Sequence, residues 1–373
     1  MELEKSVIDR INSLQDLPSL PHILVKLMEA CSDESGSLGD IATILSHDPS
    51  LCSKVLRLVN SAYYGLGSRV EGIDQAVAYL GTSAVKNIAV CSAVYQAFNS
   101  RKGDKAFNLK VFWWHSLKCA LLARIFAKEV AYGSPDEAFV AGLLHDIGKL
   151  VLWVNFSEKY TALIKKYVNR PEMLTAAESQ LGATHSQIGA WLLDRWKFQS
   201  FVADSALYHH EPLERVAHAL PLVQIVYTAD KLAGQTVEGR EDGLRVAEKL
   251  HGFSQQQVIG FLARSDEELG EVARSFGIEF ETPRESGEDL SDIDHETQEN
   301  LVHEVRDSSL LLGTLRNLVA AQEEKDILKV LQEGLKILFD VSQILFFLYD
   351  EEKETLVGKD VEGHATSSRT VSY

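Results

Sequence analysis

The chain of 373 residues is 45% hydrophobic and carries a formal net charge of -17, so it is long enough for two or three domains with a sizeable core. The acidic balance argues against a general nucleic-acid binder or a binder of anionic membranes, because either would need a basic surface to neutralise phosphates. A charged N-terminus, no apolar run of membrane-spanning length and four scattered cysteines without a Cys-x-x-Cys pair indicate a cytoplasmic protein with reduced thiols.

Residues 1–102 are predicted to form a helical N-terminal lobe. Their apolar residues recur at helical spacing in short segments that are separated by proline and glycine breaks. One segment follows His47-Asp48-Pro49-Ser50. We interpret Asp48 there as the N-cap of a helix with Pro49 at its first position, and therefore as a structural residue.

Residues 103–280 are predicted to form longer helices that carry a histidine-aspartate pair. Ser134-Pro135-Asp136-Glu137 is typical of a capping box, and the helix it begins would carry His145 and Asp146 and end near Gly148. Adjacent imidazole and carboxylate groups can bind one divalent cation, and the second carboxylate oxygen can bridge to another. Lys149, one turn further on, is placed to meet an anionic ligand held by the metal.

More histidines and a second acid accompany this pair. Asp230 lies in the apolar helix predicted from Leu222 to Ala233, where an acid is costly unless it is paired or bound to a cation. The full set of candidate ligands is His115, His145, Asp146, His185, His209, His210 and Asp230. Seven nitrogen and oxygen groups without a thiolate suit iron, manganese, magnesium or zinc in a hydrolytic site, and two metals sharing Asp146 would fit. The alternative is that these side chains hydrogen-bond to one another and to backbone, without metal.

The order His, His-Asp, His, His-His, Asp resembles the HD superfamily of metal-dependent phosphohydrolases. Four N-terminal motifs are also similar to those of the HDOD domain, the HD-related output domain of bacterial signalling proteins. They are Leu17-Pro18-Ser19-Leu20-Pro21, Asp48-Pro49-Ser50-Leu51, Val59-Asn60-Ser61-Ala62-Tyr63-Tyr64-Gly65 and Ala76-Val77-Ala78-Tyr79-Leu80-Gly81. The resemblance covers about Leu14 to Gly277. It implies a mainly α fold, in which a helical N-terminal lobe packs on an HD-like bundle, and a role in signal transduction.

The resemblance also implies roles for the candidate residues. One metal would be held by His115, His145, Asp146 and Asp230. The second would share Asp146 and add His185, His209 and His210. In an active enzyme a metal-activated water would attack phosphorus while Lys149 stabilises the phosphoryl oxygens. HDOD domains commonly lack much of this set and are largely non-catalytic, whereas this chain carries all of it.

The residues after the histidine pair bear on the substrate. Cyclic di-GMP phosphodiesterases have a similar pair followed by a Gly-Tyr-Pro signature. Here Glu211 and Pro212 follow instead, and the signature is absent. Cyclic di-GMP is therefore disfavoured as the substrate.

The C-terminal part is predicted to change character. Ser254 to Phe276 is typical of an amphipathic helix, and residues 281–299 form an acidic linker. Residues 300–373 begin with an apolar stripe at 301–322 that fits either a homodimeric coiled coil or a helix packed on its own domain. The stripe consists of Leu301, Val305, Ser308, Leu312, Leu315, Val319 and Gln322.

A helix through Leu338 is then expected, followed by a strand from Val341 to Tyr349 and a second strand at 355–357. This succession is similar to the opening of a GAF sensory domain. The sequence ends after these two predicted strands, so we assign no ligand to the segment.

Two functions remain open on the sequence. The first is a regulatory module that holds a pair of divalent metals, with iron or manganese favoured over magnesium or zinc, and signals to protein partners with little or no turnover. The second is a working metal-dependent phosphohydrolase or phosphodiesterase that acts on a nucleotide. A scaffold without metal is a third, weaker hypothesis.

Overall fold

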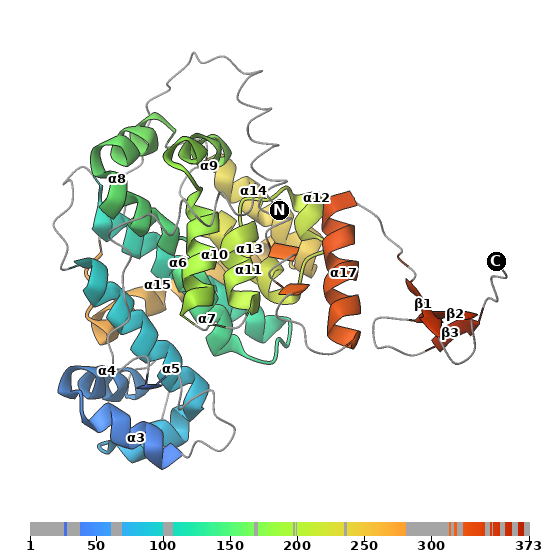
Figure 1. Cartoon of the computed structure of the whole chain (residues 1–373). Helices are drawn as coiled ribbons and strands as arrows, with labels where there is room; N and C mark the ends of the chain where they lie inside the picture. Colours follow the sequence, from blue (N-terminus) through green and yellow to red (C-terminus); the bar gives the residue numbers. More distant parts are fainter. Residues whose placement is uncertain are drawn as a thin grey trace.

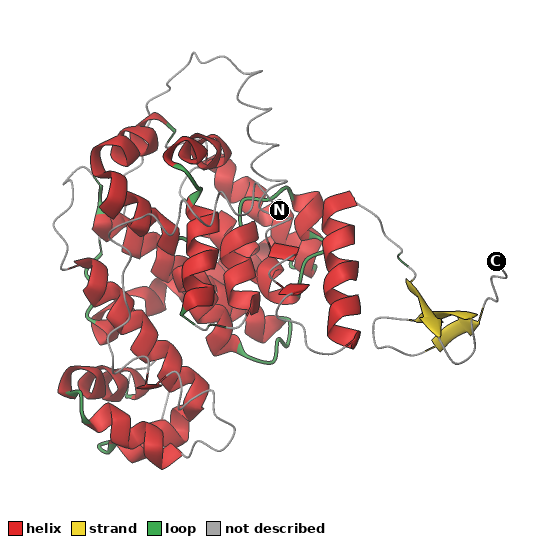
Figure 2. Ribbon diagram, viewed as in Figure 1, coloured by secondary structure: helices red, strands yellow, loops and turns green. Residues whose placement is uncertain are grey.

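The computed structural model describes residues 26–27, 38–60, 69–99, 107–167, 171–196, 198, 200–234, 237–280, 313–314, 317–318, 324–339, 344, 346–350, 355–359 and 365–368. The motif at 17–21, Cys31, the predicted linker at 281–299 and most of the stripe at 301–322 lie outside these residues. The described part is mainly helical, which confirms the predicted fold class (Figure 2).

A group of N-terminal helices forms one end of the molecule (Figure 1). These helices are α3 (Leu38–Ser46), α4 (Pro49–Val59) and α5 (Ile73–Asn99). The side chain of Asp48 accepts a hydrogen bond from the N–H of Leu51, so its predicted role as the N-cap of α4 is confirmed. The amide of Asn60 both donates to the carbonyl of Val70 and accepts its N–H, at 2.7 Å each. Part of the Val59–Gly65 motif therefore has a structural use.

The larger lobe is built around α6 (Leu109–Glu129), which packs against α7, α13 and α15. Residues 116–127 of α6 are buried without interruption, so apolar residues lie on every face of this stretch, with Lys118 and Arg124 as its buried charges. The other helices of the lobe are α7 (Pro135–Leu144), α8 (Ile147–Lys166), α9 (Pro171–Glu178), α10 (His185–Arg195), α11 (Ser200–Tyr208), α12 (Leu213–Val216), α13 (Pro221–Ala233), α14 (Val237–His251) and α15 (Gln255–Phe276), with the 3-10 turn η1 (Ser179–Leu181) between α9 and α10.

The start predicted for the helix of the histidine-aspartate pair is confirmed, because Ser134 is the N-cap of α7 and Pro135 its first residue. The predicted end was wrong. Helix α7 ends at Leu144, so that His145 and Asp146 lie in a turn before α8 begins at Ile147. The predicted capping box does not form. The Ser134 side chain makes no capping hydrogen bond, and the Glu137 carboxylate accepts from the Tyr132 hydroxyl. Gly148 does not end a helix. It lies in the first turn of α8, at a close approach to α10.

Among the described residues, one helical stretch is long and apolar enough to cross a membrane by length and composition. It runs from Pro135 to Lys166, through α7, the turn and α8, and its most apolar window has a mean hydropathy of 1.3. In the fold, 78% of its most apolar window is buried inside the lobe. We therefore assign it to the folded core of this lobe.

The C-terminal elements match the sequence in part. Helix α15 confirms the predicted amphipathic helix, with Ser254 in a capping box at its start and Gly277 in the left-handed conformation at its end (φ 68°). Helix α17 (Glu324–Phe339) confirms the predicted helix through Leu338 and packs against α12. Ahead of it, the Asn317 amide donates to the Asp204 carboxylate of α11 at 2.9 Å.

The last described elements are three short antiparallel strands in the order β1-β2-β3: β1 (Phe346–Asp350), β2 (Thr355–Lys359) and β3 (Ala365–Ser368). Ile344 lies outside a strand, so the first strand begins later than the predicted Val341. The third strand was not predicted. Of its residues, Ala-Thr-Ser-Ser, only Thr366 favours a strand, and the segment is held by pairing with β2.

Candidate metal centre

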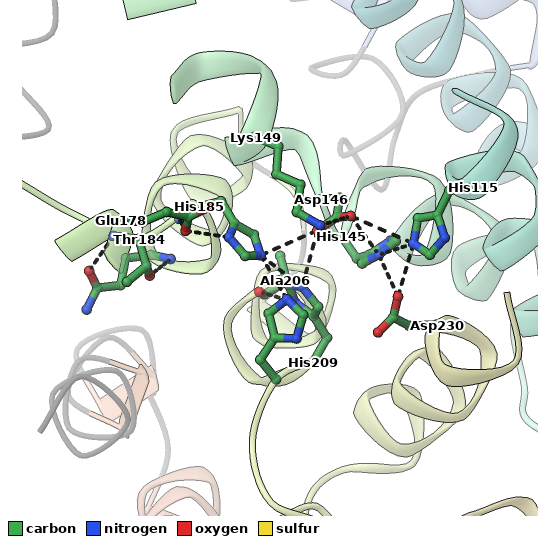
Figure 3. Close-up of polar contacts among 12 residues, drawn as sticks. His115, His145, Asp146, Lys149, Glu178, Thr184, His185, Ala206, His209 and Asp230 are labelled. Atoms are coloured by element: carbon green, nitrogen blue, oxygen red, sulfur yellow. Dashed lines mark hydrogen bonds and ion pairs between the residues drawn. The ribbon is translucent and has the colours of Figure 1, made fainter. Parts of the chain in front are cut away.

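All seven candidate ligands come together in the larger lobe. Figure 3 labels all of them except His210. They come from helix α6, the turn between α7 and α8, the start of α10, the turn after α11, and α13. Asp146, His185, His209 and His210 form one group and His115, His145 and Asp146 another, each with ligand atoms within 4.8 Å of one another. Asp230 adjoins the second group, because its Oδ1 lies 3.0 Å from His115 Nε2 and 3.3 Å from His145 Nε2.

We name the two groups the His185 half (Asp146, His185, His209 and His210) and the His115 half (His115, His145, Asp146 and Asp230).

Asp146 lies between the two halves. Its Oδ1 is 3.5 Å from His185 Nε2 and 3.3 Å from His209 Nε2, whereas its Oδ2 is 3.4 Å from His145 Nε2. Oδ1 is buried and accepts no hydrogen bond among the described residues. A buried carboxylate oxygen without a donor is costly, and a cation on that side would satisfy it.

The hydrogen bonds on the outer ring nitrogens fix how the histidines face the centre. The Nδ1 atoms of His145 and His209 lie 2.7 and 2.8 Å from the carbonyls of Gly142 and Ala206. Because a carbonyl only accepts, each Nδ1 must carry the hydrogen, and a neutral ring then turns the lone pair of Nε2 inward. These are the bonds that orient metal-ligating histidines in other proteins.

The facing Nε2 atoms give the strongest indication of a metal. His185 and His209 approach through Nε2 at 3.2 Å, and His185 Nδ1 contacts the Glu178 carboxylate, which also only accepts. In their neutral forms both rings therefore present lone pairs to each other with no hydrogen between them. A shared cation converts this repulsion into coordination. His210 Nε2 lies 3.0 Å from the same His185 atom, so a third donor converges there.

The buried acids and imidazoles of the site shift one another's pKa values. Burial alone would raise the pKa of Asp146, but the Lys149 ammonium, 2.6 Å from Oδ2, and His145 hold it well below its ordinary value. Burial would lower the pKa of His145, but Asp146 raises it well above the ordinary value. Burial lowers the pKa of His209 to about 4. Without a metal, the positive charges that stabilise the Asp146 carboxylate therefore come from Lys149 and from protonated His145.

Gly148 brings the two halves together. A Cβ atom at this position would collide with the carbonyl oxygen of His185 and crowd the amide nitrogen of Gly189. Only glycine therefore lets the first turn of α8 touch the first turn of α10. This contact sets Asp146, two residues earlier, beside His185.

Sequence reasoning missed two residues behind His185. Glu178, at the end of α9, is fully buried and contacts both the ring and the backbone of His185. Thr184 forms a capping box with Gln187 that begins α10. The available signal was an acid in the small-residue run Ala176-Ala177-Glu178, seven residues before a histidine, which is too weak to single out.

The donor set fits a pair of divalent cations. It offers only imidazole nitrogens and carboxylate oxygens, arranged in two groups around one carboxylate. Neither group includes a cysteine, although the buried Cys119 thiol hydrogen-bonds to His145. His47, outside the centre, adjoins the residue that caps α4. The arrangement therefore suits metal binding, without specifying which metal.

A family profile, the HDOD domain, matches residues 17–212 of the chain. An uncharacterised protein of Treponema pallidum is 26% identical over 288 residues, which is 75% of this chain and 52% of that protein. A cyclic di-GMP phosphodiesterase of Pseudomonas aeruginosa is 33% identical over 115 residues, or 30% of this chain and 25% of the enzyme. The matched parts thus span about half or less of these relatives.

Solved structures agree with the fold. A presumed phosphohydrolase from Shewanella amazonensis is 26% identical and superposes with a TM-score of 0.58, covering 73% of this chain and 97% of that one. An HDOD domain protein of unknown function from Geobacter sulfurreducens superposes with a TM-score of 0.57 at 23% identity, covering 75% of this chain and 98% of that one.

Proposed function

The chain belongs to the HDOD domain family, and from this premise we propose that it is a cytoplasmic signal-transduction module that holds two divalent metals and has little or no turnover. The observation that carries the proposal is the complete histidine-carboxylate cluster centred on Asp146. The names of related proteins support the family and leave the activity open.

In this proposal the His115 half and the His185 half each hold one metal, iron or manganese in preference to magnesium or zinc. The metals would supply positive charge that satisfies Asp146 Oδ1 and would act as Lewis acids toward a phosphate-bearing ligand. The chain's own groups prepare the site. Gly142 and Ala206 accept the Nδ1 hydrogens of two rings, and this keeps Nε2 available to the metals.

Three features support regulation over turnover. His145, Asp146, His185 and His209 are at most 2% exposed. A reactant would therefore reach the ligands only at the partly exposed His115, His210 and Asp230. Lys149, which would meet a phosphate, is instead paired with Asp146 at 2.6 Å. In addition, Glu211 is buried and Pro212 precedes α12 at the position where the Gly-Tyr-Pro signature would lie.

The second candidate is hydrolysis of a nucleotide phosphodiester. It is favoured by the stretch that is 33% identical to a cyclic di-GMP phosphodiesterase and by the 21% exposure of the Lys149 side chain. In an enzyme, Lys149 would leave Asp146 once metals neutralise that carboxylate and would hold a phosphoryl oxygen.

We extend the proposal to partners. The apolar stripe at 301–322 would pair two copies of the chain, and a GAF-like segment after it would receive the signal. Light scattering of the intact chain tests the dimer: a dimeric mass that becomes monomeric in a Leu312→Asp, Leu315→Asp double variant supports it, whereas a monomeric wild-type chain refutes it.

Elemental analysis tests the metal site. Protein purified without chelator should contain about two equivalents of metal, and the Asp146→Ala variant should contain almost none. Folded protein that takes up no added iron, manganese, magnesium or zinc would overturn the proposal. Incubation of metal-loaded protein with cyclic di-GMP or bis(p-nitrophenyl) phosphate separates the two functions. Hydrolysis that disappears in Asp146→Ala would replace the regulatory role with the enzymatic one.

A further inference from the structure

Beyond the ligands themselves, we propose that Glu178 is a positioning residue that holds the His185 ring as an Nε2 donor and so sets the metal affinity of the His185 half. This inference rests on the proposed metal site. It assigns a role to a buried carboxylate that lies outside the candidate ligand set.

Glu178 directs both of its carboxylate oxygens at neighbouring donors. Oε2 lies 2.5 Å from His185 Nδ1 and 2.8 Å from the backbone nitrogen of His185. Oε1 accepts from the Tyr160 hydroxyl of α8 at 2.9 Å. Glu178, Tyr160 and His185 are all fully buried. The ring is thereby fixed by a carboxylate that is itself fixed from the other side, as Figure 3 shows for Glu178 and His185.

The hydrogen bond that Glu178 makes to the His185 ring differs from those that orient the His145 and His209 rings. His145 and His209 donate to neutral backbone carbonyls within their own turns, whereas His185 donates to a charged group from another helix. A carboxylate polarises the imidazole more strongly than a carbonyl does and makes Nε2 a better donor to a cation. The His185 half therefore contains the ring with the strongest outer partner.

A purely structural role for Glu178 makes a different prediction. The bond to the His185 backbone nitrogen satisfies one of the free N–H groups in the first turn of α10, which the Thr184 capping box also stabilises. If only this bond mattered, the loss of Glu178 would lower stability and leave the ring tautomer and metal affinity unchanged. The bond to Nδ1 predicts changes in both.

The chain offers a matched control. Glu137 also accepts from a tyrosine hydroxyl, that of Tyr132, at 2.7 Å, but it lies at the start of α7 and contacts none of the cluster histidines in the contacts described. Glu178→Gln and Glu137→Gln remove one carboxylate charge each and keep the side-chain size. Tyr160→Phe is an intermediate case, because it removes one donor to Glu178 and leaves the contacts with His185 in place.

The first measurement determines the tautomer of His185 by nitrogen-15 NMR of the histidine side chains. It uses the intact protein after a chelator has removed any bound metal. We expect an Nδ1-protonated ring with a strongly downfield proton in wild type. Glu178→Gln should lose the strong downfield shift, because a neutral amide oxygen accepts more weakly than a carboxylate, whereas Glu137→Gln and Tyr160→Phe should retain it. This readout needs no metal and no activity. A signature that is unchanged in folded Glu178→Gln would overturn the inference.

The second measurement is metal affinity by competition with a chelator, using Mn²⁺ or Zn²⁺. Glu178→Gln should weaken one of the two sites by about 10- to 100-fold, Tyr160→Phe should weaken it less, and Glu137→Gln should match wild type. Equal affinities in wild type and Glu178→Gln would refute the role of Glu178 and leave the metal site intact. A wild-type chain that binds neither metal would refute the proposed function, whatever the NMR result.

Discussion

Substitution of Gly148 by alanine tests the contact that assembles the centre. The added Cβ would collide with the carbonyl oxygen and carbon of His185 and crowd the nitrogen of Gly189. These are backbone atoms, so no change of side-chain rotamer can relieve the collision. The first turns of α8 and α10 would therefore have to part by roughly 1 Å or more to restore van der Waals contact, which would move Asp146 away from His185.

The magnitude follows from two opposing effects. Overpacking of this kind costs about 1–3 kcal/mol, and a rigid backbone contact belongs at the upper end. Replacing glycine by alanine inside a helix returns up to about 1 kcal/mol. We expect Gly148→Ala to lower the free energy of unfolding by about 2 kcal/mol and to weaken metal binding in the His185 half.

Gly260 provides the control for this experiment. It lies inside α15, and an added Cβ there would meet no atom within 4 Å, so Gly260→Ala should gain up to about 1 kcal/mol. Urea denaturation of the chelated proteins measures both changes, and a metal titration follows the centre. A Gly148→Ala protein that is as stable as wild type and binds metal equally would refute the close-contact argument.

Three further predictions concern single carboxylates and pH. Asp230→Asn should remove at least half of the bound metal, because Asp230 serves only the His115 half; elemental analysis that finds both metals retained would contradict the role of Asp230 in that half. Asp48→Ala should lower the free energy of unfolding by about 1 kcal/mol through loss of the α4 cap, with unchanged metal content, as urea denaturation and elemental analysis would show. Burial lowers the pKa of His209 to about 4 and that of His210 well below its ordinary value. Below pH 6.5 the unfolded chain therefore binds more protons than the folded chain. The free energy of unfolding should be highest above pH 6.5 and should fall as the pH drops toward 4. For one such histidine the loss at pH 5 is up to about 2 kcal/mol. Denaturation of chelated protein at pH 7 and pH 5 measures the net change. His145, whose pKa is raised, gains stability over the same interval and offsets part of the loss. Stability that rises toward pH 5 would contradict neutral His209 and His210.

The candidate ligands could be predicted from the sequence because their residue types and their order along the chain are typical of a metal site. Asp230 stands out as an acid in an apolar helix, and the His145-Asp146 pair stands out among helical patterns. The structure brings both together with the remaining histidines. Asp48 was separated from the set by the proline that follows it, and its capping bond bears this out.

The break between α7 and α8 was not predictable from periodicity. The apolar pattern runs from Phe139 to Trp153 without a gap, and the residues that leave the helix do so in a turn held by contacts with distant elements. Gly148 resembles a helix stop in the sequence because the backbone of His185 cannot be seen from a local pattern. Glu178 was missed for the same reason, since its partners lie in α8 and at the start of α10.

The position of Asp146 makes the two halves thermodynamically linked. One carboxylate contributes Oδ1 to one group and Oδ2 to the other, so a cation bound on either side changes the charge and the freedom of the oxygen that the other side needs. Such coupling is reciprocal: whatever factor the first ion imposes on the affinity for the second, the second imposes on the first. An event that disturbs only one half, such as a shift of α13 or of α10, would therefore be felt at both.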